Sequence, residues 1–200
     1  MSARSARAAA RSFPVQKAIL WASVALVAVG VLVAIGLANR SVPPTVASAP
    51  PLATLSVGDP APAFSIATTH GGFALASVHR PVLLEVFATW CPHCQHETRT
   101  LNALYDRYHR SIDFLAVSGS PYAIDRNSPE SLPDVLAFGE YFGVRYPLAF
   151  DPSLEVAQRY LQGGYPTLVL IGTGKRVAYV GSGEISESVL EAQIRRSIAK

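Results

Sequence analysis

Two cysteines, Cys91 and Cys94, carry the chemistry that the sequence most clearly supports. They enclose Pro92 and His93, a spacing that lets the two sulfur atoms meet across one turn of chain. The sequence has no third cysteine with which either could form a separate disulfide. Because a disulfide stabilises more when it closes a longer loop, a bridge this short would add little stability. The pair is therefore interpreted as a redox-active site.

The elements expected around the motif favour the same chemistry. Val82–Ala88 is an almost continuous apolar run, which predicts a buried strand, and the spacing of later apolar residues predicts a helix from Pro92 to about Arg110. Cys91 would then lie at the helix N-terminus, where unpaired backbone N–H groups and the helix dipole favour a thiolate, the attacking species. We expect Cys91 to be the exposed nucleophile. We expect Cys94, one turn along, to be the buried thiol that resolves a mixed disulfide.

The rest of the chain beyond residue 56 alternates short apolar strands with amphipathic segments. This pattern predicts an α/β fold with a mixed central sheet flanked by helices and an N-terminal hairpin. The expected strands are Phe64–Ala67 and Phe73–Leu75 around a Gly71-Gly72 turn, Ile112–Val117, Thr167–Ile171 and Arg176–Val180, and the expected helices are Asp134–Phe142, Ser153–Leu161 and Ser186–Ile198.

The first 56 residues have a different composition. Residues 18–38 are 21 consecutive uncharged residues, long enough for a helix that crosses a bilayer. Four cationic residues precede this span and one follows it, which predicts a basic cytoplasmic tail at residues 1–17. Residues 39–56, rich in Pro, Ala and Ser, are expected to link the membrane anchor to a domain at 57–200. A cleaved signal peptide that ends near Ala47–Ala49 is the alternative; both place the domain on the extracytoplasmic side of the cell membrane.

The charge of the chain argues against nucleic acid as a partner. Residues 1–40 hold five Lys and Arg residues and no acid, so the net charge of +3 leaves −2 for residues 41–200. The expected domain therefore carries no basic stripe.

Several segments together resemble a known family. Val82–Leu101 (VLLEVFATWCPHCQHETRTL) resembles the active-site region of thioredoxin-fold proteins, above all the membrane-anchored TlpA/ResA-like thiol–disulfide oxidoreductases. Residues 57–64 resemble the entry segment that these proteins share with peroxiredoxins, as in a redoxin or AhpC/TSA-like domain. Residues 164–167 resemble the cis-proline loop, and residues 172–175 the C-terminal hairpin. The resemblance covers roughly residues 55–198.

The resemblance implies roles for further residues. Pro166 would hold a cis peptide that keeps metals and strands from the sulfurs, while the backbone of Tyr165 would dock substrate. Glu85 would lie beneath the cysteines and move protons to and from Cys94, and Glu97 would occupy a second acid position. Trp90 would shield the nucleophile. Three simpler roles stay open: a strand-opening proline at 166, a solvent-facing Glu85 and a solvated Glu97.

The function that the resemblance implies is thiol–disulfide exchange on exported proteins that contain cysteine, with a preference for the reducing direction. Apocytochromes awaiting haem attachment in cytochrome c biogenesis are candidate partners, with an upstream thiol as electron donor and no cofactor or metal. The Pro92-His93 dipeptide instead resembles that of DsbA-type oxidases, whose nucleophile is an unusually stable thiolate.

Two further functions fit the residues less well. A peroxiredoxin-type antioxidant enzyme would need a Thr or Ser three residues before its cysteine, whereas Thr89 is two before Cys91. A non-enzymatic copper-binding module would need a histidine late in the chain, whereas the last one is His109.

Overall fold

The computed structural model describes residues 54–199 together with residues 21, 26 and 29–31. The chain divides into two compact units, residues 1–48 and 49–200, of which the second is described below. Residues 21, 26 and 29–31 are helical, but most of the predicted span at 18–38 and of the linker at 39–56 lies outside the described residues. Within the parts of the chain that are described, no helix combines the length and the apolar character needed to cross a membrane.

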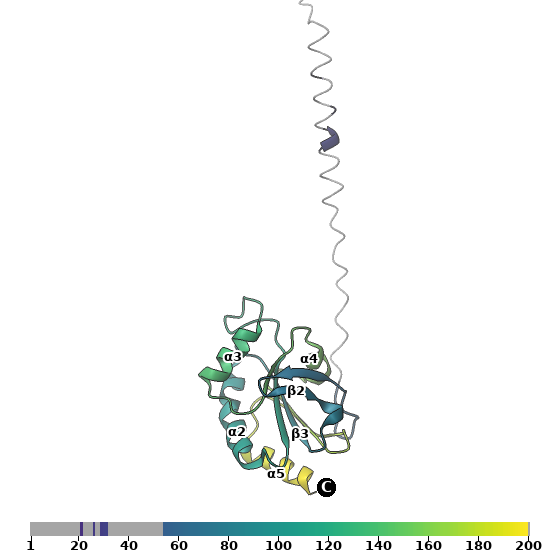
Figure 1. Cartoon of the computed structure of the whole chain (residues 1–200), viewed down its shortest axis with the longest axis vertical. Helices are drawn as coiled ribbons and strands as arrows, with labels where there is room; N and C mark the ends of the chain where they lie inside the picture. The colour runs from purple at the N-terminus through teal and green to yellow at the C-terminus, as the bar shows by residue number, and fades with distance from the viewer. Residues whose placement is uncertain (1–20, 22–25, 27–28, 32–53, 200) are drawn as a thin grey trace, which may run out of the picture. The chain divides into compact units, whose positions relative to one another are not determined.

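A five-stranded mixed sheet forms the centre of the second unit (Figure 1). Its strand order is β5-β4-β3-β6-β7, with β3, β4 and β5 parallel and with β6 antiparallel to both β3 and β7. The strands are β3 (Val82–Phe87), β4 (Asp113–Ser118), β5 (Leu148–Phe150), β6 (Thr167–Ile171) and β7 (Val177–Ser182). All six residues of β3 are buried, because the strand is central and both faces of the sheet are covered.

Helices α2, α3 and α5 contribute to the core on one face of the sheet, and α4 to the core on the other. The helices are α2 (Pro92–Tyr108), α3 (Leu132–Tyr141), α4 (Glu155–Tyr160) and α5 (Glu187–Ile198). A separate antiparallel hairpin of β1 (Ser65–Thr68) and β2 (Gly71–Ala74), followed by a short 3-10 helix at Leu75–Ser77, lies on the α4 side. Strand side chains alternate between faces, so Leu83 and Phe87 of β3 pack toward α2, whereas Leu84 and Val86 pack toward α4.

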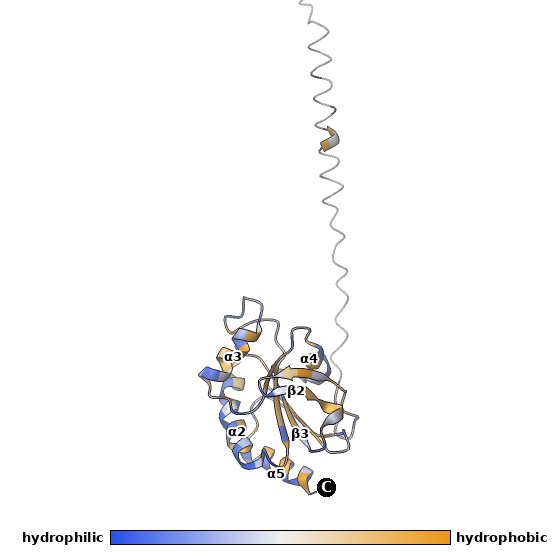
Figure 2. Ribbon diagram, in the orientation of Figure 1, coloured by the Kyte–Doolittle hydropathy of each residue, from blue (hydrophilic) through white to orange (hydrophobic). Residues whose placement is uncertain are grey.

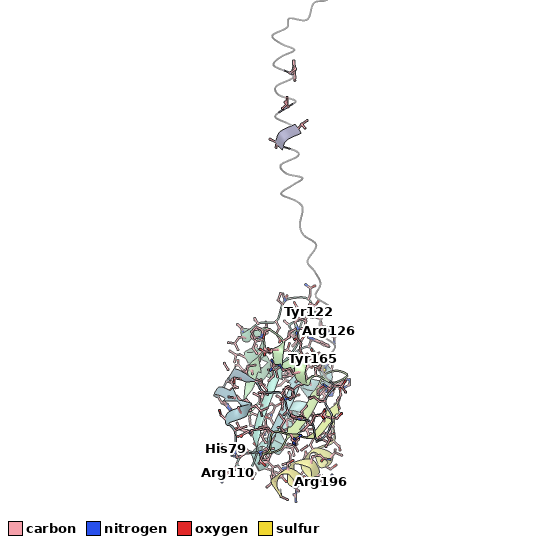
Figure 3. All side chains as sticks on the ribbon, turned by 90° about the vertical axis from the view of Figure 1, so that its right-hand side faces the viewer. His79, Arg110, Tyr122, Arg126, Tyr165 and Arg196 are labelled. Carbon is pink, nitrogen blue, oxygen red and sulfur yellow. The ribbon has the colours of Figure 1, made fainter. Side chains whose placement is uncertain are left out.

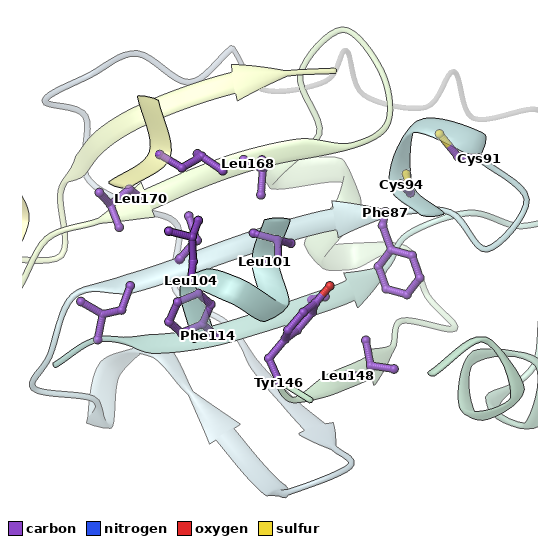
Figure 4. Packing of buried hydrophobic residues seen from close by; sticks show 14 of the residues in the cluster. Phe87, Cys91, Cys94, Leu101, Leu104, Phe114, Tyr146, Leu148, Leu168 and Leu170 are labelled. Carbon is purple, nitrogen blue, oxygen red and sulfur yellow. The ribbon is translucent and has the colours of Figure 1, made fainter. Parts of the chain in front are cut away.

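The amphipathic patterns expected from the sequence are visible in the hydropathy of the helices (Figure 2). In α2, Leu101 and Leu104 are buried while Tyr105 and Tyr108 are partly buried, as their spacing predicted. These two leucines join Phe114, Leu168 and Leu170 in a core that reaches the two cysteines at one end (Figure 4).

The α/β fold class, the mixed sheet and the N-terminal hairpin are confirmed, with two local corrections. The hairpin turn lies at Thr69 and His70, and the two glycines that were expected to form it are the first residues of β2. Strand β5 was not predicted, because three residues between a helix and a loop are too few to show a period.

Candidate active site

The cysteine motif lies where β3 ends and α2 begins. Cys91 is the N-cap residue of α2 with an extended backbone, and Pro92 occupies the first turn, where its missing N–H has no partner to lose. The Cys91 N–H donates to the Ala88 carbonyl at 3.0 Å, and the Cys91 carbonyl accepts from Gln95 at 3.1 Å. The strand therefore delivers Cys91 directly to the positive end of the helix dipole, as predicted.

Cys91 is less accessible than expected, with 4% of its surface exposed. Its thiol Sγ donates to the backbone carbonyl of Tyr165 at 3.5 Å, and the Tyr165–Pro166 peptide is cis, as the resemblance implied. The Tyr165 hydroxyl donates to the Gly119 carbonyl at 2.6 Å, which fixes this side chain beside the motif. The prediction of an exposed nucleophile is therefore wrong, because the loop that carries Tyr165 covers the sulfur.

Trp90 forms a second wall of the site. Its indole N–H donates to Ser120 Oγ at 2.8 Å, and its ring meets that of Tyr165 edge to face with centroids 5.7 Å apart. The guanidinium of Arg126 lies 5.1 Å from the Trp90 ring centroid. Tyr165, Arg126 and Tyr122 are at one end of the domain, opposite His79, Arg110 and Arg196 (Figure 3). The long β4–α3 loop thus packs against the cysteine motif, which the sequence did not indicate.

Cys94 lies inward from Cys91 on the same turn of α2 and is 1% exposed (Figure 4). Both cysteines are free thiols. Burial, and then the negative charge of Glu85, raise the pKa of the Cys94 thiol well above its usual range. Cys94 therefore needs a proton acceptor before it can attack a disulfide, since the thiolate is the attacking species.

Glu85 lies in the middle of β3 with 3% of its surface exposed, so the solvent-facing alternative is excluded. It shares the sheet face of Leu83 and Phe87, which is the face that α2 covers. Burial and the charge of Glu97 raise the pKa of Glu85, while a hydrogen bond with Tyr146 lowers it. Among the residues that the structure describes, none forms a hydrogen bond with its Oε1.

Glu97 is also buried, at 2% exposure, which excludes a solvated helix residue. Burial raises the pKa of Glu97 to about 7, although the Ile185 N–H donates to its Oε2 at 3.2 Å and thereby lowers that pKa. Its Oε1 has no hydrogen-bond partner within the described part of the chain. The charge of Glu85 thus acts on the buried thiol, and that of Glu97 acts on Glu85. Buried carboxyls with raised pKa values beside a thiol are suited to proton transfer.

Two buried groups near the motif were not predicted. The Tyr146 phenol interacts with both Glu85 and Thr98, and Tyr146 itself follows α3 in a segment without periodicity. Glu130 accepts a hydrogen bond from Thr89 Oγ1 at 2.7 Å and another from Ser118 Oγ. A glutamate between two prolines in a loop gives no sequence signal of burial, so neither residue could be found from the pattern alone.

The surface hollows and the metal-ligating side chains of the domain were compared with the position of the cysteines. A hollow of about 480 Å³ lies between β1 and α4, on the sheet face away from the cysteines. A smaller, mainly apolar hollow of about 260 Å³ is lined by Thr89, Ile124, Phe138, Tyr141 and Phe142. Among the described residues, no three His, Cys, Asp or Glu side chains are grouped as a metal site would require.

The chain is similar in sequence to proteins named thiol-disulfide oxidoreductase ResA. The chain is 29% identical over 143 residues to the thiol-disulfide oxidoreductase ResA of Geobacillus kaustophilus, which covers 70% of this chain and 77% of that protein. It is 27% identical over 140 residues to ResA of Bacillus subtilis, covering 68% and 73%.

Solved structures have the same fold. A thiol:disulfide interchange protein of the thioredoxin family from Chlorobium tepidum matches with a TM-score of 0.55 and 26% identity, covering 72% of this chain and 99% of that chain. StoA from Bacillus subtilis matches with a TM-score of 0.56 and 19% identity, covering 66% and 96%, which shows the fold alone. The model of the AhpC/TSA family matches residues 57–180, a stretch that holds both cysteines, Glu85, Glu97 and the cis-proline loop. The chain belongs to that family.

Proposed function

We propose that this protein is a thiol–disulfide oxidoreductase that exchanges disulfides with cysteine-containing proteins through Cys91 and Cys94. The observation that carries the proposal is the placement of Cys91 at the N-terminus of α2, with Cys94 buried behind it. Cys91 Sγ lies 3.5 Å from the carbonyl oxygen of Tyr165. The names of the relatives support the same activity, since ResA is called a thiol-disulfide oxidoreductase in both species.

In the reducing direction, the Cys91 thiolate attacks one sulfur of a substrate disulfide. The substrate S–S bond breaks, a Cys91–substrate bond forms, and the second substrate sulfur leaves as a thiolate that takes up a proton. Cys94 then gives its proton to Glu85 and attacks Cys91 Sγ, which forms the Cys91–Cys94 disulfide and releases the first substrate sulfur. The substrate gains two electrons, and an upstream dithiol returns the pair to its reduced form.

The residues around the cysteines have positioning roles in this scheme. The backbone carbonyl of Tyr165 faces Cys91 Sγ, so a substrate chain that docks along this loop would present its sulfur to Cys91. Trp90 limits the access of water to the sulfur from the side of the β4–α3 loop. Glu97 would exchange protons with Glu85, whose pKa its charge raises.

The decisive test uses the full-length chain in an insulin reduction assay. Cys91→Ala should abolish turnover, and Cys94→Ser should accumulate a mixed disulfide with insulin that is visible on a non-reducing gel. Peroxide consumption and copper stoichiometry are measured beside it. Turnover of peroxide, or binding of one copper ion, without thiol exchange would overturn the proposal.

The reducing direction and the cellular site are further parts of the proposal. The expected anchor at residues 18–38 would leave residues 1–17 in the cytoplasm and the domain outside, where exported apocytochromes are candidate substrates. Protease treatment of intact cells should then remove the domain and spare the tail, and a mature chain that begins near Pro50 would contradict the anchor.

A second candidate function is that of a disulfide oxidase, because the Pro92-His93 dipeptide resembles that of DsbA-type oxidases. A reduction potential of the pair near about −270 mV would indicate a reductant, and one near about −120 mV an oxidant.

A further inference from the structure

His93, which belongs to the dipeptide that resembles that of oxidases, has a carboxylate partner. Its Nδ1 lies 2.6 Å from Oε1 of Glu184, which belongs to the loop between β7 and α5. Because a carboxylate only accepts, the imidazole N–H is the donor. His96, one turn further along α2, has its Nδ1 3.5 Å from the same oxygen. The motif is thus bound to a loop some 90 residues away, which its own sequence does not indicate.

The loop that presents Glu184 is itself held in place. The next residue, Ile185, donates its backbone N–H to Glu97 Oε2 at 3.2 Å. One side of the loop therefore contacts a buried acid of the site while the other holds the exposed ring of His93. The pKa of Glu184 lies below its usual value, mainly because of the hydrogen bond from His93. The Glu184 side chain is therefore a negatively charged carboxylate in this pair.

The charge of Glu184 opposes the effect of a histidine beside a catalytic thiol. A positive imidazole near a thiolate stabilises the reduced form and makes the disulfide a stronger oxidant. A carboxylate on the same ring offsets that positive charge and holds the ring toward the β7–α5 loop. We propose that Glu184 is a positioning residue that restrains His93 and thereby keeps the Cys91–Cys94 pair more reducing than the Pro92-His93 dipeptide alone would make it.

This inference rests on the proposed thiol–disulfide exchange and specifies its direction. The relevant equilibrium transfers two electrons and two protons from two glutathione molecules to the Cys91–Cys94 disulfide, which gives two thiols and one glutathione disulfide. Removing the Glu184 charge should favour the dithiol side. His93 and Glu184 are 65% and 48% exposed, so the effect is that of a solvated pair and is modest.

The experiment measures the glutathione equilibrium constant of the full-length chain by alkylation and gel shift. Glu184→Gln should shift the constant toward the dithiol by about threefold, which is about 14 mV for a two-electron couple. The same substitution should have no effect in a His93→Gln background and should keep its effect in a His96→Gln background. Glu187→Gln is the matched control, because this exposed carboxyl three residues later pairs with Arg107 instead.

An unchanged constant in Glu184→Gln would overturn the inference, as would an equal shift with and without His93, because Glu184 would then act through Glu97 or directly on the thiols. A wild-type chain that never equilibrates with glutathione would instead overturn the proposed exchange activity itself. The two failures are therefore distinguishable.

Discussion

Glu85 is a buried charged residue in an otherwise apolar strand, and the proton-transfer role proposed for it comes at the expense of packing. The other five residues of β3 are apolar and fully buried, so Glu85 is the one ionisable group in the strand. A buried carboxyl with an unpartnered oxygen is costly unless it stays protonated, which is why the pKa of Glu85 is raised. In the proposed mechanism the ionised form of this carboxyl accepts the Cys94 proton, and the raised pKa makes it a stronger base.

Replacing Glu85 with glutamine should therefore slow the step in which Cys94 resolves the mixed disulfide. Glutamine keeps the size of the side chain but cannot accept a proton, so we expect the rate to fall by about 100-fold. The rate is measured by quenched-flow alkylation after a mixed disulfide with Cys91 has been formed.

A pH profile separates this role from a structural one. The wild-type rate should fall as the pH is lowered through the titration of the buried carboxyls, and that dependence should weaken in Glu85→Gln. Glu140→Gln, at an exposed position on α3, serves as the control. A variant with the wild-type rate and profile would remove Glu85 from the mechanism.

At the scale of elements, the β4–α3 loop is fixed to the end of β3 by Glu130. This buried carboxyl accepts from Thr89, two residues before Cys91, and from Ser118 at the end of β4. The loop also places Ser120 against Trp90. The position of the cysteine motif is thus set by the loop as well as by β3 and α2.

Glu130→Leu should destabilise the domain by about 2–3 kcal/mol, because it leaves the hydroxyls of Thr89 and Ser118 without their acceptor. Urea unfolding measures the loss. The triple variant that adds Thr89→Val and Ser118→Ala should recover part of it, since no unpaired polar group then remains. A triple variant less stable than Glu130→Leu would show that the network contributes by packing instead.

The close approach of α4 to the sheet depends on Gly119. A Cβ at this position would lie 2.6 Å from Ala157 Cβ and 2.9 Å from Val86 Cγ1, and the alanine methyl cannot rotate away. Gly119→Ala should therefore reduce stability by about 1–3 kcal/mol. Gly174→Ala, where no atom lies within 4 Å, is the control in the same urea unfolding experiment. Equal stability of both variants would mean that α4 shifts without cost.

The sequence predicted the elements that carry a period or a motif. The apolar run of β3, the amphipathic pattern of α2 and the cis-proline loop all lie where they were expected. The sequence could not predict β5, Tyr146 or Glu130, because a three-residue strand has no period and a buried polar loop residue has the composition of an exposed one. The Glu184–His93 pair could not be predicted either, since only the tertiary fold brings the β7–α5 loop to the motif.

At the scale of the whole molecule, the buried acids Glu85 and Glu97 make the free energy of unfolding depend on pH. A carboxyl whose pKa is raised on folding binds its proton more tightly in the folded state, so it favours folding at low pH and loses that contribution as the pH rises. The pKa of Glu97 is about 7 against an ordinary value of 4.5, and that of Glu85 is raised in the same direction. The window of the loss attributed to Glu97 therefore runs from about pH 4.5 to about pH 7.

The wild-type protein should lose stability relative to Glu97→Gln across this window, by an amount on the order of 3 kcal/mol. Urea unfolding of both proteins at pH 4.5 and pH 8 gives the difference directly. A constant difference between wild type and variant at the two pH values would show that Glu97 has the same pKa in the folded and unfolded chains.

The charged residue in the central strand has a consequence for anyone who redesigns this protein. A screen that selects for heat resistance would favour leucine or valine at position 85, because an apolar side chain fills the same buried site without an unpartnered oxygen. Variants chosen in that way would fold better and exchange disulfides more slowly. Thermostability and turnover measured side by side across a library would then identify the working residues of the site as those where the two quantities move in opposite directions.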